Sequence, residues 1–211
     1  MVEVMKYKEI KIVGHQRSGS HWISRLIDIN FFNGVGYLQR YNGHLWGHSE
    51  RSLRYLRNVN QVAVIYTYRN LDDTVDSIYR MRHRFGLDED DFEKFKTTPM
   101  QEMFNPTIEV DAVVNDTKSE KHISDVDTSL SERQETVIEY INDNRESWLV
   151  HSDKPNFKMV NYDDMVNNFQ ETMLDIANFL GSNKIDFKDE YIRVGWMEKA
   201  DHKWIKPEAK L

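Results

Sequence analysis

The sequence predicts an α/β domain in which a central parallel sheet is flanked by helices. Three observations lead to this fold class: short apolar segments recur along the chain, loops rich in turn-forming residues follow them, and amphipathic helices follow those loops. Strands that alternate with helices pack as a parallel sheet, because each helix carries the chain back across the sheet. With 211 residues, we expect one domain over residues 1–211.

The first strand, loop and helix lie near the N-terminus. Residues 9–13 (EIKIV) predict a short strand, and residues 14–19 (GHQRSG) predict a tight loop. A helix is predicted over residues 20–31, because its apolar residues recur at helical spacing. These apolar residues are Trp22, Ile23, Leu26, Ile27 and Phe31.

The second unit contains a near-continuous apolar run, residues 62–66 (VAVIY), which is typical of a strand buried on both faces. The strand is expected to end at Arg69. Asn70 is then a good N-cap, because its side-chain oxygen can accept hydrogen bonds from the first free amides of a helix. The apolar face of that helix is marked by Leu71, Val75 and Ile78.

The third unit lies late in the chain. Residues 157–162 (FKMVNY) predict a strand, Asp163 is predicted to cap the next helix, and Gly181 is predicted to end it. The apolar stripe of this helix consists of Met165, Phe169, Met173, Ile176 and Leu180.

Two further segments complete the pattern. A helix is predicted over residues 132–150, because Ser129 and Glu132 have the spacing of a capping box. Residues 85–130 are acidic and polar and contain Pro99 and Pro106. Loops of this length are often functional or disordered, so we predict an insertion or lid there, with a plain solvated connection as the alternative.

The composition excludes several classes of protein. The formal net charge of -7 argues against a protein that binds duplex DNA through a broad cationic face. The absence of cysteine excludes disulfides, cysteine-based zinc sites and thiol nucleophiles. No stretch has the apolar length of a signal peptide core or a membrane span, so a cytoplasmic location with no membrane or nucleic-acid partner is expected.

The loop of residues 14–19 has the G-x-x-x-x-G spacing of a phosphate-binding loop. Backbone amides and the dipole of the following helix favour an anion there. Ser20 and His21 follow, where an NTPase has lysine and a Mg²⁺-binding hydroxyl residue. The cation lies instead within the loop at Arg17, whose planar guanidinium can bind two oxygens of a phosphate or sulfate. We therefore predict anion binding without a metal, with a simple strand-to-helix turn as the alternative.

Residues 14–22 (GHQRSGSHW) resemble the 5′-phosphosulfate loop of sulfotransferases that use 3′-phosphoadenosine 5′-phosphosulfate (PAPS). The family form is P-[KR]-[ST]-G-[ST]-[ST]-W, and this chain departs from it at Gln16 and His21. The resemblance implies a P-loop-type three-layer fold, with PAPS as co-substrate and 3′,5′-adenosine diphosphate as product. It also implies a set of donor-binding residues, in which the tryptophan stacks on the adenine. They are Arg17, Ser18, Gly19, Ser20, His21 and Trp22.

Two later segments are similar to other motifs of the same family. Residues 66–70 (YTYRN) followed by Ser77 resemble the 3′-phosphate motif, and Ser77 lies about two helical turns beyond Arg69. Residues 161–165 (NYDDM) resemble the Y-E-D-[LM] segment, which implies that Tyr162 lies beside the adenine. A core position is the alternative for both Tyr162 and Trp22.

The C-terminal family motif R-K-G-x-x-G-D-W-K is matched only by Arg193, Gly195 and a later Trp204. Arg193 is therefore predicted as a further ligand of the 3′-phosphate. The acceptor is not identified by any motif, and the residues that contact it are expected within residues 85–130.

The mechanism that the resemblance implies is direct in-line transfer of the sulfuryl group to a hydroxyl or amine of the acceptor. Arg17 and loop amides would neutralise the developing charge while a base removes the acceptor proton. We predict His48 as that base, ahead of His44, His15 and His21, because a histidine titrates near neutral pH and the family has a histidine at about this distance before the 3′-phosphate strand.

Two other functions stay open. A P-loop kinase or other NTPase would turn over ATP with Mg²⁺, although the lysine and the magnesium-binding residue are missing after Gly19. A non-catalytic nucleotide-binding module would bind nucleotide without turnover. His44 and His48 have the spacing of a metal pair, but Gly43 and Gly47 argue against a helix there, so no metal is expected.

Overall fold

The computed structural model describes residues 5–31, 54–105, 107 and 131–189. The sheet in this part of the chain has the order β1-β2-β3. Its strands are β1 (Glu9–Gly14), β2 (Val62–Tyr68) and β3 (Phe157–Asn161). Both strand pairs are parallel, so all three strands end at the same edge of the sheet. The predicted parallel sheet is confirmed.

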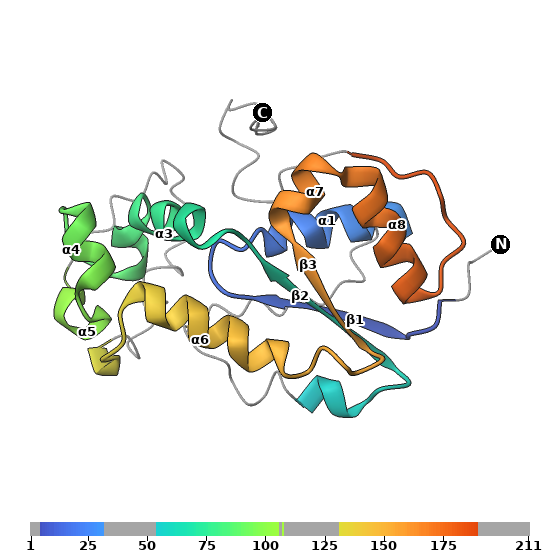
Figure 1. Ribbon diagram of the computed structural model, residues 1–211, viewed down its shortest axis with the longest axis horizontal. Coiled ribbons are helices and arrows are strands. Elements are labelled where there is room, and N and C mark those ends of the chain that lie inside the picture. The colour runs from blue at the N-terminus through green and yellow to red at the C-terminus, as the bar shows by residue number, and fades with distance from the viewer. Residues whose placement is uncertain (1–4, 32–53, 106, 108–130, 190–211) are drawn as a thin grey trace, which may run out of the picture.

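Helices cover both faces of this sheet (Figure 1). α1 (Ser20–Phe31), α7 (Tyr162–Asn167) and α8 (Phe169–Leu180) lie on one face, and α6 (Val137–Leu149) lies along the other. Buried apolar side chains fill both interfaces. Those of the first include Ile12, Leu26 and Ile176, and those of the second include Val64, Tyr66 and Trp148. The predicted three-layer α/β fold is therefore confirmed.

A further group of helices lies beyond the end of β2 (Figure 1). It contains α3 (Leu71–Tyr79), α4 (Phe92–Thr97), α5 (Met100–Met103) and the 3₁₀ turn η2 (Arg82–Phe85). These elements pack on the first half of α6 through a buried cluster that includes Ile78, Phe95, Met100 and Tyr140. Residues 85–105 of the predicted insertion therefore contain helices, whereas residues 106 and 108–130 lie outside the described residues.

Several predicted boundaries agree with the structure. α1 spans the predicted residues, and Asn70 caps α3 by accepting hydrogen bonds from the amides of Asp72 and Asp73 at 2.9 and 3.3 Å. Gly181 ends α8 with a left-handed φ of 75°, a conformation that glycine adopts without a steric penalty. A second 3₁₀ turn, η1 (Arg54–Arg57), precedes β2. None of the described helices combines the length and apolar character needed to cross a membrane.

The predicted start of α6 was wrong. The helix begins at Val137, and its capping box is formed by Thr136 and Glu139. Residues 133–136 directly before it are not helical, and the carbonyls of Arg133 and Glu135 accept hydrogen bonds from the amides of Gln101 and Met100. The segment before α6 therefore bonds to the start of α5, and the Thr136 capping box begins the helix. Ser129 of the predicted capping box lies outside the described residues.

The predicted cap at Asp163 was also wrong. β3 ends at Asn161, whose side chain caps α7 by accepting the amide of Asp163 at 3.0 Å. The Asp163 carboxylate accepts instead the amide of Asn70 at 3.1 Å. The single predicted helix is divided into α7 and α8 at Asn168, although its predicted apolar stripe is buried throughout.

Candidate functional site

The loop of residues 14–19 joins β1 to the N-terminus of α1 and is attached to the neighbouring strand β2. The Thr67 hydroxyl donates to the Val13 carbonyl at 3.2 Å, so Ser18 donates to the Thr67 hydroxyl at 2.8 Å. Both side chains are fully buried. A Cβ atom on Gly14 would lie 2.5 Å from the Thr67 carbonyl, so the close approach of loop and strand requires glycine there.

Arg17 extends from the loop to α3. Its φ of 63° lies in the left-handed region, where no other non-glycine residue of the described chain is found. The exposed side chain donates Nε to the Ser77 hydroxyl at 2.8 Å, although the two residues are 60 positions apart in sequence. The structure thus brings together two residues that the sequence predicts at the 5′ and 3′ motifs.

Tyr162 lies against the other end of the loop. A Cβ atom on Gly19, which has a φ of 84°, would lie only 2.1 Å from Cδ2 of Tyr162. The Tyr162 ring also meets the Trp22 ring edge to face, with centroids 5.4 Å apart. Trp22 is 4% exposed and belongs to the core, whereas Tyr162 is half-buried. The two predicted adenine-binding aromatics therefore pack together beside Gly19.

Arg69 directly follows the end of β2 and also contacts the Tyr162 ring. Its guanidinium carbon is 4.8 Å from the Tyr162 ring centroid. Arg69 nitrogen atoms lie 3.7 Å from an Asp73 oxygen and 3.9 Å from an Asp163 oxygen, which is too long for hydrogen bonds. Among the described residues, the buried Nε atom has no hydrogen-bond partner. Arg69 is therefore oriented by charge and ring contact, and its buried Nε forms no hydrogen bond within the described residues.

α6 supports the loop from the other face of the sheet. The Tyr140 hydroxyl donates to Oε1 of Gln16 at 3.0 Å, and the Tyr66 hydroxyl donates to Oδ1 of Asn144 at 2.8 Å. Burial raises the pKa of Tyr66 far above its ordinary value, with a smaller contribution from nearby Tyr140. Both tyrosines belong to the packed interior and fix α6 relative to β2 and the loop.

The predicted base and two predicted ligands are not placed by the structure. His48, the alternative His44 and Arg193 lie outside the described residues, as does the side chain of His21. His15 is 2% exposed, and its Nδ1 donates to the Gln16 carbonyl at 2.8 Å, which fixes the proton on that nitrogen. Ser20 begins α1. The described group at the loop therefore consists of Arg17, Ser18, Gly19, Trp22, Arg69, Ser77 and Tyr162.

The roles of three residues at this site were not predicted from the sequence. Thr67 is a hydroxyl residue within an apolar strand, and that pattern could have indicated a contact at the strand end. Asp163 was interpreted as a helix cap, although its carboxylate faces Arg69 and Asn70. Tyr140 gave no local signal, because its partner Gln16 is 124 positions away in sequence.

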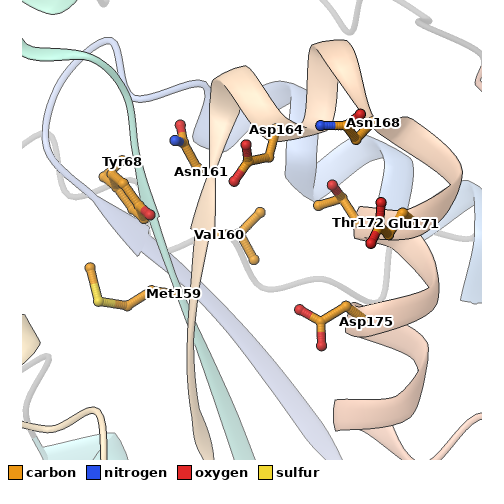
Figure 2. A pocket seen from close by; sticks show the side chains of 9 residues that line it. All are labelled: Tyr68, Met159, Val160, Asn161, Asp164, Asn168, Glu171, Thr172 and Asp175. Atoms are coloured by element: carbon orange, nitrogen blue, oxygen red, sulfur yellow. The ribbon is translucent and has the colours of Figure 1, made fainter.

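A polar groove of about 370 Å³ lies beside β3 (Figure 2). It extends from Tyr68 and Asn161, at the strand ends, along α7 and α8 to Asp175. Three carboxylates line it, those of Asp164, Glu171 and Asp175, and Asp175 is paired with Lys158; the net negative charge disfavours a phosphorylated ligand. None of the predicted donor-binding residues lines this groove, so it is distinct from the site at the loop. The described residues contain no cluster of three or more metal-binding side chains.

Comparison with known families identifies the class of protein. The family model described as "Sulfotransferase domain" matches residues 55–194, which is more than half of the chain. The chain belongs to the sulfotransferase domain family. The matched region of this sulfotransferase-family chain contains Arg69, Ser77 and Tyr162, whereas the loop of residues 14–19 precedes it.

The chain is similar to a crystal structure of mouse sulfotransferase SULT7A1 complexed with PAP, with 15% sequence identity and a TM-score of 0.46. The match covers 85% of this chain and 60% of the mouse chain, so this chain spans less than two thirds of that chain's length. No curated protein matches the sequence significantly.

Proposed function

We propose that this chain transfers a sulfuryl group from PAPS to a hydroxyl or amine acceptor by direct in-line displacement. The hydrogen bond between Arg17 and Ser77 carries the proposal. A donor that has anionic groups at its 5′ and 3′ positions needs two anion sites within the length of one nucleotide. Contact between a residue of the 5′ loop and a residue of the 3′ motif meets that requirement.

The 5′ site combines several features that favour an anion. The loop leads into the N-terminus of α1, where the helix dipole and free amides favour negative charge. Arg17 adds a full positive charge and is exposed. Its hydrogen bond to the neutral Ser77 hydroxyl is weaker than a bond to a phosphate oxygen, in which donor and acceptor are both charged, so a ligand can take its place.

The 3′ site is assigned to Arg69 and Ser77. Arg69 has buried donor capacity that no described residue satisfies by a hydrogen bond, and Ser77 is within reach of the loop. Asp73 and Asp163 hold the guanidinium near the end of β2 without occupying its donors. Arg193 is proposed as a third ligand of the 3′-phosphate, on the basis of the sequence alone.

In the proposed reaction, an acceptor oxygen or nitrogen attacks sulfur as the bond between sulfur and the bridging oxygen breaks. A base takes the acceptor proton, and 3′,5′-adenosine diphosphate leaves with the bridging oxygen. Arg17 neutralises charge on the sulfuryl and bridging oxygens, an effect that is strongest when the cation is positioned before the reaction. His48 is the proposed base, because neutral imidazole is abundant near neutral pH.

A thermal-shift comparison of three ligands tests the proposal. A sulfotransferase should be stabilised most by 3′,5′-adenosine diphosphate, since a ligand that binds only the folded state raises its melting temperature. A larger shift in melting temperature with ATP and Mg²⁺ would favour a kinase or NTPase. An equal shift with AMP would contradict the proposed 3′-phosphate site. Binding without sulfuryl transfer to any acceptor would indicate a nucleotide-binding module.

The proposal includes a cytoplasmic enzyme, a single domain over residues 1–211 and a reaction that needs no metal. The last point has a direct check. Turnover that persists in excess EDTA is expected, whereas loss of turnover that Mg²⁺ restores would contradict a metal-independent transfer.

A further inference from the structure

Residues 15–18 of the loop form a tight turn. The Ser18 amide donates to the His15 carbonyl at 3.3 Å, and Arg17 occupies the third position with its φ of 63°. A positive φ at the third position is the feature of a type II turn, where glycine is favoured. An arginine is strained in this conformation, so it persists only when the surroundings hold the backbone.

Both neighbours of Arg17 are held by side-chain hydrogen bonds. Ser18 is fixed to Thr67 of β2 at 2.8 Å. Gln16 is fixed to Tyr140 of α6, whose hydroxyl donates to Oε1 at 3.0 Å, and its carbonyl accepts Nδ1 of His15. Nε2 of Gln16 has no hydrogen-bond partner among the described residues, so the Tyr140 hydroxyl sets the orientation of this amide.

Tyr140 is a rigid anchor. It is 4% exposed and belongs to the buried cluster that joins α3, α4, α5 and α6. The Arg133 guanidinium lies 5.5 Å from its ring centroid. Because its ring cannot move without disturbing that cluster, its hydroxyl holds the Gln16 side chain at a fixed place.

We infer that Tyr140 and Gln16 are positioning residues that hold Arg17 in its strained conformation. Proline is favoured at the second position of a type II turn because its ring fixes φ. This chain has Gln16 there, and the hydrogen bond to Tyr140 supplies the restraint that a proline ring would give. The role of Arg17 at the donor rests on the proposed function, whereas the restraint on the turn does not.

Amide hydrogen exchange at Ser18 tests the restraint without any ligand. Tyr140→Phe and Gln16→Ala should each accelerate exchange roughly three- to tenfold, which corresponds to one net hydrogen bond, and the double variant should add little. Tyr79→Phe is the matched control, because it removes a tyrosine hydroxyl bonded to Asp90 from the same cluster. Unchanged exchange in Tyr140→Phe, or equal acceleration in the control, would overturn the inference.

A proline variant gives the second test. No hydrogen bond from the Gln16 amide is found among the described residues, so Gln16→Pro removes no described backbone contact. In the Gln16→Pro background, Tyr140→Phe should no longer change Ser18 exchange or the affinity for 3′,5′-adenosine diphosphate. Tyr140→Phe alone should weaken that affinity roughly three- to tenfold. The same loss in both backgrounds would show that Tyr140 acts only through general stability.

These measurements separate the two conclusions. If the wild-type protein does not bind 3′,5′-adenosine diphosphate, the proposed function fails, and the exchange experiment still decides the role of Tyr140. If the wild-type protein binds and the variants exchange and bind as it does, the inference alone fails.

Discussion

The loop that carries Arg17 and the strand end that carries Arg69 hold the same type of side chain in different ways. Arg17 is exposed on a strained turn and donates to a neutral hydroxyl. Arg69 is partly buried between two carboxylates and the Tyr162 ring, and lies outside the left-handed region. The first site is restrained through its backbone, and the second through its side-chain surroundings.

This difference indicates separate contributions. A charge held on a pre-formed turn is suited to the place where negative charge develops during a reaction. The carboxylates beside Arg69 balance part of its charge before a ligand binds. This site is therefore suited to distinguishing ligands with a 3′-phosphate from ligands without one, more than to raising the overall affinity. Changes in the loop should therefore affect every donor, and changes at the strand end should affect only donors with a 3′-phosphate.

The largest effect is expected from the proposed base, which belongs to neither arginine site. His48→Ala should lower turnover by roughly 10²- to 10⁴-fold, the usual contribution of a general base. The affinity for 3′,5′-adenosine diphosphate should stay nearly unchanged, because a base acts on the acceptor. Parallel steady-state kinetics and calorimetry measure the two quantities, and His44→Ala is the control. A greater loss in His44→Ala would reassign the base.

Arg17→Ala should lower turnover by roughly 10²- to 10³-fold while the protein remains folded, since a positioned donor is worth several kcal/mol to the transition state. Arg17→Lys should keep much of the activity, because the family accepts either cation at this position. Turnover assays and circular dichroism check this prediction, and near-wild-type turnover in Arg17→Ala would remove its catalytic role.

Gly19→Ala tests whether the loop acts on all donors. A residue with a side chain pays about 1–2 kcal/mol to adopt the left-handed conformation, and the new Cβ would also clash with Tyr162. The affinities for 5′-AMP and 3′,5′-adenosine diphosphate should fall by the same factor in calorimetric titrations. A selective loss of one ligand would show that the loop does not serve the phosphate common to both.

Sequence patterns predicted the elements whose signals are local and missed those that distant contacts determine. Asn70 and Gly181 were recognised because caps depend on one residue and its immediate backbone. The start of α6 was misplaced because two capping-box patterns lie seven residues apart, and the bonds from α5 to the segment before Thr136 leave no local signal in the sequence. Asp163 was misinterpreted because its carboxylate contacts Asn70, 93 positions away in sequence.

Arg69→Ala should act on one ligand only. The variant is expected to weaken binding of 3′,5′-adenosine diphosphate roughly ten- to a hundredfold, which is the range for a charge-assisted hydrogen bond. Binding of 5′-AMP should change little. Isothermal titration of both ligands measures the difference, and an equal loss for both would mean that Arg69 does not meet the 3′-phosphate.

The smallest effect is expected from the cap of the helix that carries Ser77. Asn70→Ala removes the acceptor for two amides of α3 and should lower stability by about 1 kcal/mol. Fraying of α3 reduces the fraction of molecules in which Ser77 is in place, so affinity for 3′,5′-adenosine diphosphate should fall by no more than about threefold. Asp91→Ala is the control, because Asp91 caps α4 through the Lys94 amide and α4 carries no proposed ligand. Chemical denaturation should show that both variants are destabilised, and titration should show a weakened affinity for 3′,5′-adenosine diphosphate in Asn70→Ala only.

An equal loss of that affinity in Asp91→Ala would assign the effect to the stability of the whole helical group, since α3 and α4 share one buried cluster.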